Sequence, residues 1–249
     1  AQRRGGKGVS GMQTKEEDVV TNLFVANTHT QLLFFTTDGM VYKLKTWRLP
    51  QGARTAKGKA IVNILPIPTG VSVAAIMPVD RDEKDWDDLQ VVFATSAGTV
   101  RRNKLSDFTN VKSNGKIAMK FEGEHEGTTL INARIASNDD DVMLVTDAGR
   151  AIRFPATDVR IFNSRNSVGV RGIRLGKGDN LVSMSVIRHF EATSEERVAY
   201  LKQRRLMAGL TDDDSTDDEE EQVQAGHRTL RRDVGSRRPD LNDHRQGRG

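Results

Sequence analysis

The chain has 249 residues, and its 38 Lys and Arg against 34 Asp and Glu give a formal charge of +4 at pH 7. Eight of the acidic residues lie in one run, residues 212–221, so the rest of the chain carries about +12, and a basic chain of this kind predicts a polyanionic partner. The absence of cysteine excludes disulfides, thiolate metal sites and a cysteine nucleophile, and it fits a reducing compartment.

No apolar signal region follows Arg3 and Arg4 near the N-terminal end, and the chain does not begin with Met. We therefore expect a fragment of a cytoplasmic protein. The longest uncharged stretch, residues 60–79, is long enough to cross a bilayer, but Asn63, Gly70 and three prolines interrupt it. We expect no membrane span and no membrane partner.

A short basic box lies near the N-terminus, where the chain reads Gln2, Arg3, Arg4, Gly5, Gly6, Lys7 and Gly8. Glycines let the backbone approach a phosphate closely and expose its N–H groups, and Arg and Lys supply positive charge. Composition alone also allows a disordered basic tail. The repeats described next favour a built feature, because the spacing from Arg4 to Gly8 recurs from Arg54 to Gly58 and from Arg165 to Gly169.

Three segments share one pattern, an apolar β-rich run that ends in a small polar turn and a glycine. They are residues 32–39, 91–98 and 142–149, and a second extended run that carries positive charge follows each glycine. Because glycine supplies the positive φ of a tight turn, the pattern predicts three hairpins closed at Gly39, Gly98 and Gly149. Four aromatic side chains of these runs are predicted to lie in the core: Phe34, Phe35, Phe93 and Phe154.

A second glycine follows each hairpin, at Gly58, Gly115 and Gly169, and a short apolar run precedes each hairpin, at residues 23–26, 73–78 and 130–135. Four strands in each repeat of roughly fifty residues predict an all-β ring of propeller-like blades. The whole repeats span about 20–65, 73–121 and 129–175. A β-sandwich with Gly-closed hairpins is the alternative, and two landmarks that recur in phase argue against it.

The basic box resembles the hallmark box of the C-terminal domain of the DNA gyrase A subunit. Residues 23–29, 61–66 and 169–175 are also similar to that family, so the likeness covers residues 2 to about 190. Topoisomerase IV, a close relative, usually carries a degraded or missing box. Gyrase is therefore the better match, and the C-terminal domain of the topoisomerase IV A subunit is the alternative.

The resemblance implies a six-bladed β-pinwheel that wraps duplex DNA around a basic rim without choosing a sequence, in support of ATP-dependent negative supercoiling. The partners that it implies are an A-subunit dimer and the gyrase B subunit. It also implies that the protein is cytoplasmic and associated with the nucleoid. The ATP and Mg that the family uses belong to the rest of the enzyme. Three whole repeats over residues 1–190 make an incomplete ring of four-stranded blades. The catalytic tyrosine of the family is not expected here, because neither Tyr42 nor Tyr200 lies in a motif like its own.

Bending a stiff duplex requires phosphate contacts spread along a curved surface, and cations that recur once per blade supply that arrangement. The predicted rim residues are Lys43, Lys45, Arg48, Arg54, Lys57 and Lys59 in the first repeat, Arg101, Arg102, Lys104, Lys112 and Lys116 in the second, and Arg150, Arg153, Arg165, Arg171 and Arg174 in the third. For any one of them the alternative is a solvated strand face or a salt bridge.

Catalytic and metal-ligating patterns are absent from the sequence, so no cofactor is expected in this chain. The histidines share no ligand spacing: His29, His125, His189, His227 and His244. An enzyme on a propeller is therefore disfavoured, and a propeller-type module that binds acidic protein partners is the second hypothesis. The acidic stretches 80–88 and 139–141 are expected to be exposed loops.

Beyond residue 190 the composition changes. Thr193 and Glu196 have the spacing of a capping box, which predicts a helix of a turn or two at the start of an acidic insert, residues 191–226, that is disordered further on. Residues 227–249 form an irregular basic tail. The stretch 239–247 is compatible with codons that, read one nucleotide later, encode a Gly-closed strand, so the tail is also consistent with a frameshifted translation.

Overall fold

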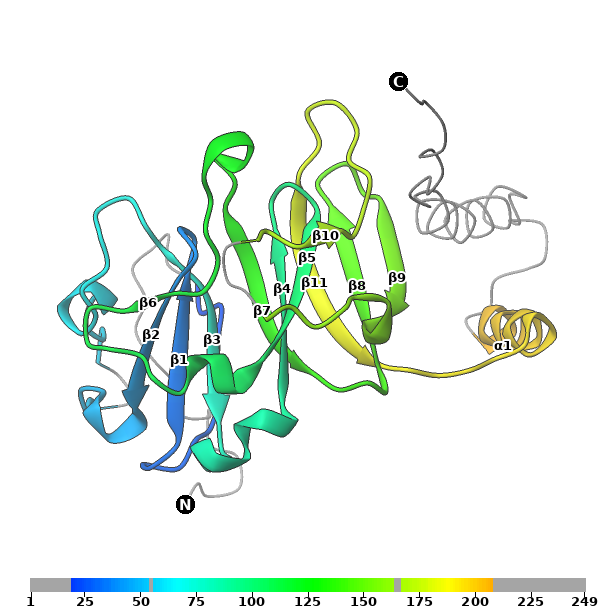
Figure 1. Ribbon diagram of the computed structural model, residues 1–249. Helices are drawn as coiled ribbons and strands as arrows, with labels where there is room; N and C mark the ends of the chain where they lie inside the picture. The colour runs from blue at the N-terminus through cyan, green and yellow to red at the C-terminus, as the bar shows by residue number, and fades with distance from the viewer. Residues whose placement is uncertain (1–18, 54–55, 164–166, 208–249) are drawn as a thin grey trace, which may run out of the picture. The chain divides into compact units, whose positions relative to one another are not determined.

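The computed structural model describes residues 19–53, 56–163 and 167–207. The chain divides into two compact units, residues 1–189 and 190–249. The regular elements in the described part of the first unit are strands and short 3-10 helices, joined by loops (Figure 1). The strands are β1 (Gln31–Thr36), β2 (Met40–Lys45), β3 (Val73–Val79), β4 (Gln90–Thr95), β5 (Thr99–Lys104), β6 (Lys116–Ile117), β7 (Leu130–Ala136), β8 (Asp140–Thr146), β9 (Ala151–Pro155), β10 (Val170–Arg171) and β11 (Leu181–Arg188). Short 3-10 helices connect them: η1 (Thr46–Arg48), η2 (Ile61–Asn63), η3 (Glu83–Asp88), η4 (Leu105–Phe108), η5 (Gly123–His125) and η6 (Ala156–Asp158).

The three predicted hairpins are confirmed as the antiparallel pairs β1–β2, β4–β5 and β8–β9. The glycine that closes each turn has a positive φ, 82° at Gly39, 75° at Gly98 and 78° at Gly149. A buried threonine begins each turn and accepts the glycine N–H through its carbonyl, at 2.9 to 3.0 Å, in the pairs Thr36–Gly39, Thr95–Gly98 and Thr146–Gly149. This recurrent threonine is a repeat signal that the glycine pattern alone did not use.

The hairpins form three sheets, with strand orders β3-β1-β2-β6, β10-β5-β4-β7 and β11-β8-β9. Each sheet combines a hairpin with strands of the following repeat, since β3 and β6 both come from the second repeat but flank the first hairpin. The assignment of all four strands of a blade to one repeat is therefore wrong. Periodicity could not distinguish the two arrangements, because a strand keeps the same spacing whether it pairs with the hairpin before it or after it.

This exchange explains why residues 23–26 are not a strand. Their counterparts β3 and β7 pair with the hairpin of the preceding repeat, and the described residues contain no hairpin ahead of residues 23–26. Leu23 and Val25 are more than nine-tenths exposed. In the part of the chain that the structure describes, the third sheet has three strands, so the incomplete ring is confirmed, with two of its blades four-stranded.

The inner strands connect one sheet to the next. β3 packs against β7, and β7 packs against β11. The N–H of Leu130 donates to the carbonyl of Thr37 in the first turn, and the N–H of Leu181 donates to Ser96 in the second, both at 2.9 Å. Because the same bond recurs at the same repeat position, each sheet is placed on its neighbour in the same way.

The core lies between the sheets. Phe35, Phe93 and Phe108 form an edge-to-face cluster with ring centroids 5.4 to 5.8 Å apart, and all three are fully buried. Such pairs add about 0.5–1.5 kcal/mol each beyond the burial of their area. Phe34 and Phe154 are also buried, so the prediction of four core aromatics is confirmed.

Most side chains of residues 80–88 are exposed, as predicted, whereas in residues 139–141 Asp140 and Asp141 belong to β8 and are not part of an exposed loop. Within residues 80–88, Trp86 is fully buried and its indole N–H donates to the carbonyl of Arg81 at 3.0 Å, which anchors η3 to the core. Asp141 is 1% exposed and accepts hydrogen bonds from Arg153 and His189. Counting charges could not reveal either buried residue. Trp86 is buried because it is apolar, although acidic residues surround it, and Asp141 is buried because two cationic side chains pair with it.

The second unit contains α1 (Ser194–Met207) among its described residues. The predicted capping box is confirmed, with the N–H of Glu196 donating to Thr193 Oγ1 at 3.2 Å and the N–H of Thr193 donating to Glu196 Oε2 at 2.9 Å. The helix has 14 residues, longer than the one or two turns expected, because strong helix formers continue to Met207. The acidic run and the basic tail lie outside the described residues.

Candidate nucleic-acid interface

The interface begins with the outer segments that close the first two sheets, which contain β6 and β10. The carbonyl of Gly39 accepts the N–H groups of Ala118 and Met119 at 2.8 and 2.9 Å, and the carbonyl of Gly98 accepts those of Gly172 and Ile173 at 2.9 and 3.1 Å. The same pair of bonds therefore attaches each outer segment to its hairpin turn. The predicted equivalence of Gly115 and Gly169 holds in the structure, since both have a positive φ and lie against the preceding hairpin.

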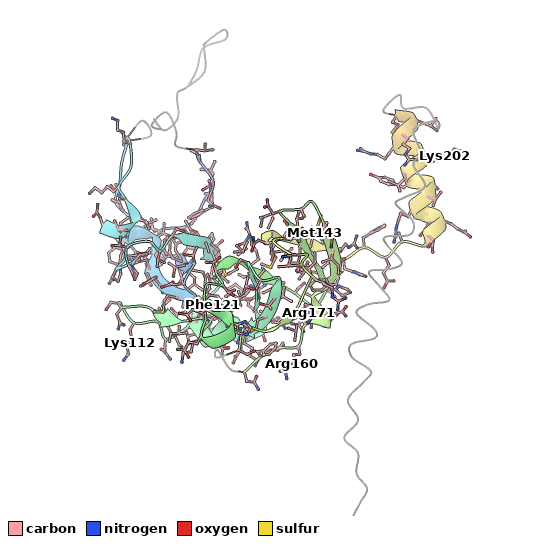
Figure 2. The ribbon with its side chains drawn as sticks, turned by 90° about the horizontal axis from the view of Figure 1, so that it is seen from above. Lys112, Phe121, Met143, Arg160, Arg171 and Lys202 are labelled. Atoms are coloured by element: carbon pink, nitrogen blue, oxygen red, sulfur yellow. The ribbon has the colours of Figure 1, made fainter. Side chains whose placement is uncertain are left out.

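Exposed cations lie on and beside these outer segments. Lys112 precedes β6, whereas Arg171 and Arg174 lie within and after β10, and Lys57 and Lys59 flank Gly58 at the matching place of the first repeat. Figure 2 labels Lys112 and Arg171, which belong to the outer segments of the first and second sheets. Other predicted rim residues that are exposed lie on or next to the hairpins: Lys45, Arg48, Lys104 and Arg150.

Several predicted rim cations are turned toward the protein instead. Lys43 Nζ is 2.7 Å from Glu83 and also donates to the carbonyl of Thr109. Lys116 Nζ donates to the carbonyl of Asp107 at 2.7 Å. Arg153 is exposed, but its Nε donates to Asp141 at 2.6 Å. These side chains hold loops and strands together.

Arg101 and Arg102 are buried, and their assignment to the rim is wrong. Arg101 is 0% exposed and donates to the carbonyls of Ala118 and Ser167, while Arg102 is 5% exposed and donates to Asn138 Oδ1 at 3.1 Å. Burial lowers the pKa of Arg102 because it disfavours the charged form. Their positions on β5 turn both side chains toward neighbouring segments, which sequence spacing could not reveal.

Residues 2–8, Arg54 and Arg165 lie outside the described residues. The DNA-binding box therefore stays a prediction, as do these two arginines.

The structure also places cationic and aromatic groups that the repeat pattern missed. Arg160 is exposed, and its guanidinium lies 4.3 Å from the centre of the Phe162 ring. Trp47 is 56% exposed, with the Arg48 guanidinium 5.3 Å from its ring centre. These two residues and Lys45 help to line an open hollow of about 370 Å³ at the end of β2. None of these pairs recurs in all three repeats, so periodicity could not find them.

Metal and membrane features were sought in the same described ranges. There, no group of three or more His, Asp and Glu side chains could hold a metal ion. Within those ranges, no helix is long and apolar enough to span a bilayer.

The repeated sheets, with outer strands exchanged between repeats and cations on the outer segments, define a propeller-like domain of the β-pinwheel class. The profile of the family described as DNA gyrase C-terminal domain, beta-propeller, matches residues 1–27, 30–80, 90–128 and 140–188. The chain belongs to this family.

Relatives and solved structures agree with this assignment. The chain is 46% identical over 217 residues to the DNA gyrase A subunit of Granulibacter bethesdensis, an alignment that covers 85% of this chain and 23% of the relative. The chain thus spans about a quarter of the length of that curated protein. Two solved structures share the fold: a C-terminal domain of DNA topoisomerase IV (TM-score 0.57, 23% identity, 66% of this chain and 49% of that one) and a DNA gyrase A C-terminal domain (TM-score 0.51, 22% identity, 71% and 57%).

Proposed function

We propose that this chain binds duplex DNA without sequence preference and holds it bent along the outer segments of its sheets, as part of the C-terminal domain of a gyrase A subunit. The observation that carries the proposal is the recurrence of exposed cations beside equivalent glycines, at Lys57 and Lys59, at Lys112, and at Arg171 and Arg174. A duplex bent over several blades meets such a group at each one.

The energetics favour phosphate contacts over base readout. Smooth bending of a short duplex by 40–90° costs roughly 1–6 kcal/mol, and contacts distributed along the bend offset that cost. Cations on edge loops reach phosphates at any base sequence, because the backbone charge is the same everywhere.

The same proposal includes the rest of the enzyme. The partners are an A-subunit dimer and a gyrase B subunit, the location is the cytoplasm with the nucleoid, and ATP and Mg act in other parts of the complex. Wrapping by this chain supports ATP-dependent negative supercoiling, and the chain contributes no catalytic group of its own.

A topology assay tests wrapping directly. Relaxed plasmid is incubated with the chain and a nicking-closing enzyme, and the topoisomers are separated after the protein is removed. We expect the linking-number distribution to shift as protein is added. Binding that leaves the distribution unchanged, or that prefers one base sequence, contradicts the proposal.

The box is tested in the enzyme assembled from A and B subunits. Replacing Arg3, Arg4 and Lys7 by Ala is expected to abolish negative supercoiling, because the box no longer holds the wrapped duplex, while relaxation and simple DNA binding persist. Supercoiling at the unsubstituted rate rules out this role for the box.

A further inference from the structure

Arg101 connects two outer segments that belong to different sheets. Its Nη2 donates to the carbonyl of Ala118, directly after β6 in the first sheet, and its Nη1 donates to the carbonyl of Ser167, three residues before β10 in the second sheet. The side chain is 0% exposed, so the guanidinium lies between these segments and not at the surface.

The contacts use what distinguishes arginine from lysine. The guanidinium is planar, weakly hydrated and presents N–H donors in a rigid fork, so one side chain satisfies two carbonyls in different directions. The ring of Phe93 lies 5.4 Å from its central carbon, which supports the cation from another side. At the matching position of the first hairpin, Tyr42 makes a single bond, from its hydroxyl to the carbonyl of Pro66 at 3.2 Å.

Both segments that Arg101 contacts carry exposed cations. Lys112 lies six residues before Ala118, and Arg171 lies four residues after Ser167. The first of these loops is also held at its other end, where Lys116 donates to Asp107 and Lys43 donates to Thr109. Arg101 is the group that joins this braced loop to the corresponding loop of the next sheet.

We propose that Arg101 is a positioning residue that sets the spacing between the phosphate-contacting segments of the first and second sheets, so that both engage one duplex. The inference rests on the proposed function. Phosphates recur at a regular spacing along DNA. Cations held in place at a matching spacing bind without the entropy cost of ordering two independent loops.

The test compares Arg101→Met, Arg101→Lys and a control, Leu65→Ala, in the complete chain. Leu65 is 3% exposed and packs in the cluster of Leu32, Phe34, Tyr42 and Ile67, so its truncation lowers stability outside the two clusters to which Ala118 and Ile173 belong. Binding to a short duplex is measured across a salt series, and amide hydrogen exchange is measured on the free proteins. Lysine keeps the charge but lacks the fork.

We expect both Arg101 variants to reduce the magnitude of the log–log salt slope by about 1.8, the equivalent of two lost phosphate contacts. The amides of Ala118, Met119, Gly172 and Ile173 are expected to exchange at least about tenfold faster in both variants, because their segments open more often. The control keeps the unsubstituted slope.

Each arm decides a different question. A wild-type slope and wild-type exchange in Arg101→Lys overturn the positioning role, and this variant decides alone if Arg101→Met does not fold. Faster exchange with an unchanged slope also overturns it, since the segments then move without consequence for DNA. If the unsubstituted chain binds no duplex, the proposed function fails, and exchange still reports whether Arg101 braces the two segments.

Discussion

Some charged side chains of this chain face solvent and others face the protein interior, and Asp141 is the clearest buried example. It is 1% exposed and accepts hydrogen bonds from Arg153 Nε at 2.6 Å and His189 Nδ1 at 2.8 Å. Burial on its own raises the pKa of Asp141, but the bonds and charges of His189 and Arg153 outweigh it, so the pKa lies below its ordinary value. The ionised form is therefore stabilised by folding.

This cluster predicts how stability depends on pH. A carboxyl with a depressed pKa in the folded state contributes stability above its unfolded pKa of about 3.9 and loses it as pH falls through the folded pKa. We expect Asp141→Asn to lower the free energy of unfolding by about 1–3 kcal/mol at neutral pH. The loss shrinks toward acid pH, as measured by urea unfolding across a pH series. A deficit that stays constant with pH contradicts this account.

At the scale of elements, the exchange of outer strands gives glycines at equivalent repeat positions different surroundings. A Cβ at Gly39 would lie 2.1 Å from the carbonyl oxygen of Met119, because an outer segment crosses the turn there. A Cβ at Gly149 meets nothing within 4 Å in the part of the chain that the structure describes. Both residues have a positive φ, so both substitutions by alanine carry backbone strain.

The pair forms a matched test of strand exchange. Gly149→Ala is expected to cost about 1–2 kcal/mol of unfolding free energy, from φ alone. Gly39→Ala is expected to cost about 1–3 kcal/mol more, because the outer segment must move. Denaturant unfolding measures both, and exchange of the Ala118 amide reports the displacement. Equal losses are incompatible with the observed packing.

At the scale of the whole molecule, we expect duplex binding to depend on where the charges lie and not only on the net charge. Arg134 and Arg188 are exposed on inner strands β7 and β11, whereas Lys112 and Arg171 belong to outer segments. A change of two charges alters the long-range field equally at either place. Only direct phosphate contact changes the number of counterions released on binding.

Two double variants of equal charge separate these effects. Lys112→Gln with Arg171→Gln is expected to reduce the magnitude of the salt slope by about 1.8, and Arg134→Gln with Arg188→Gln is expected to leave it near the unsubstituted value. Duplex binding titrated with salt provides the measurement. Equal reductions in both variants would mean that net charge, and not an outer rim, governs binding.

Local features of the fold could be predicted from the sequence because their causes are local. A glycine at positive φ and an apolar run on either side specify a hairpin within about a dozen residues, and Thr193 with Glu196 specifies a helix start within one turn. The recurrence of these signals, together with the box at residues 2–8, was sufficient to indicate the family.

Tertiary structure decided which hairpin each strand joins and which way each cation faces. Strand β6 pairs with hairpin residues 75 to 77 positions earlier, and a constant repeat length is equally compatible with either neighbour. Arg101 and Arg171 look alike in the chain, yet one is buried against two carbonyls and the other is exposed. The direction of a side chain depends on segments distant in sequence, which only the packed sheets bring together.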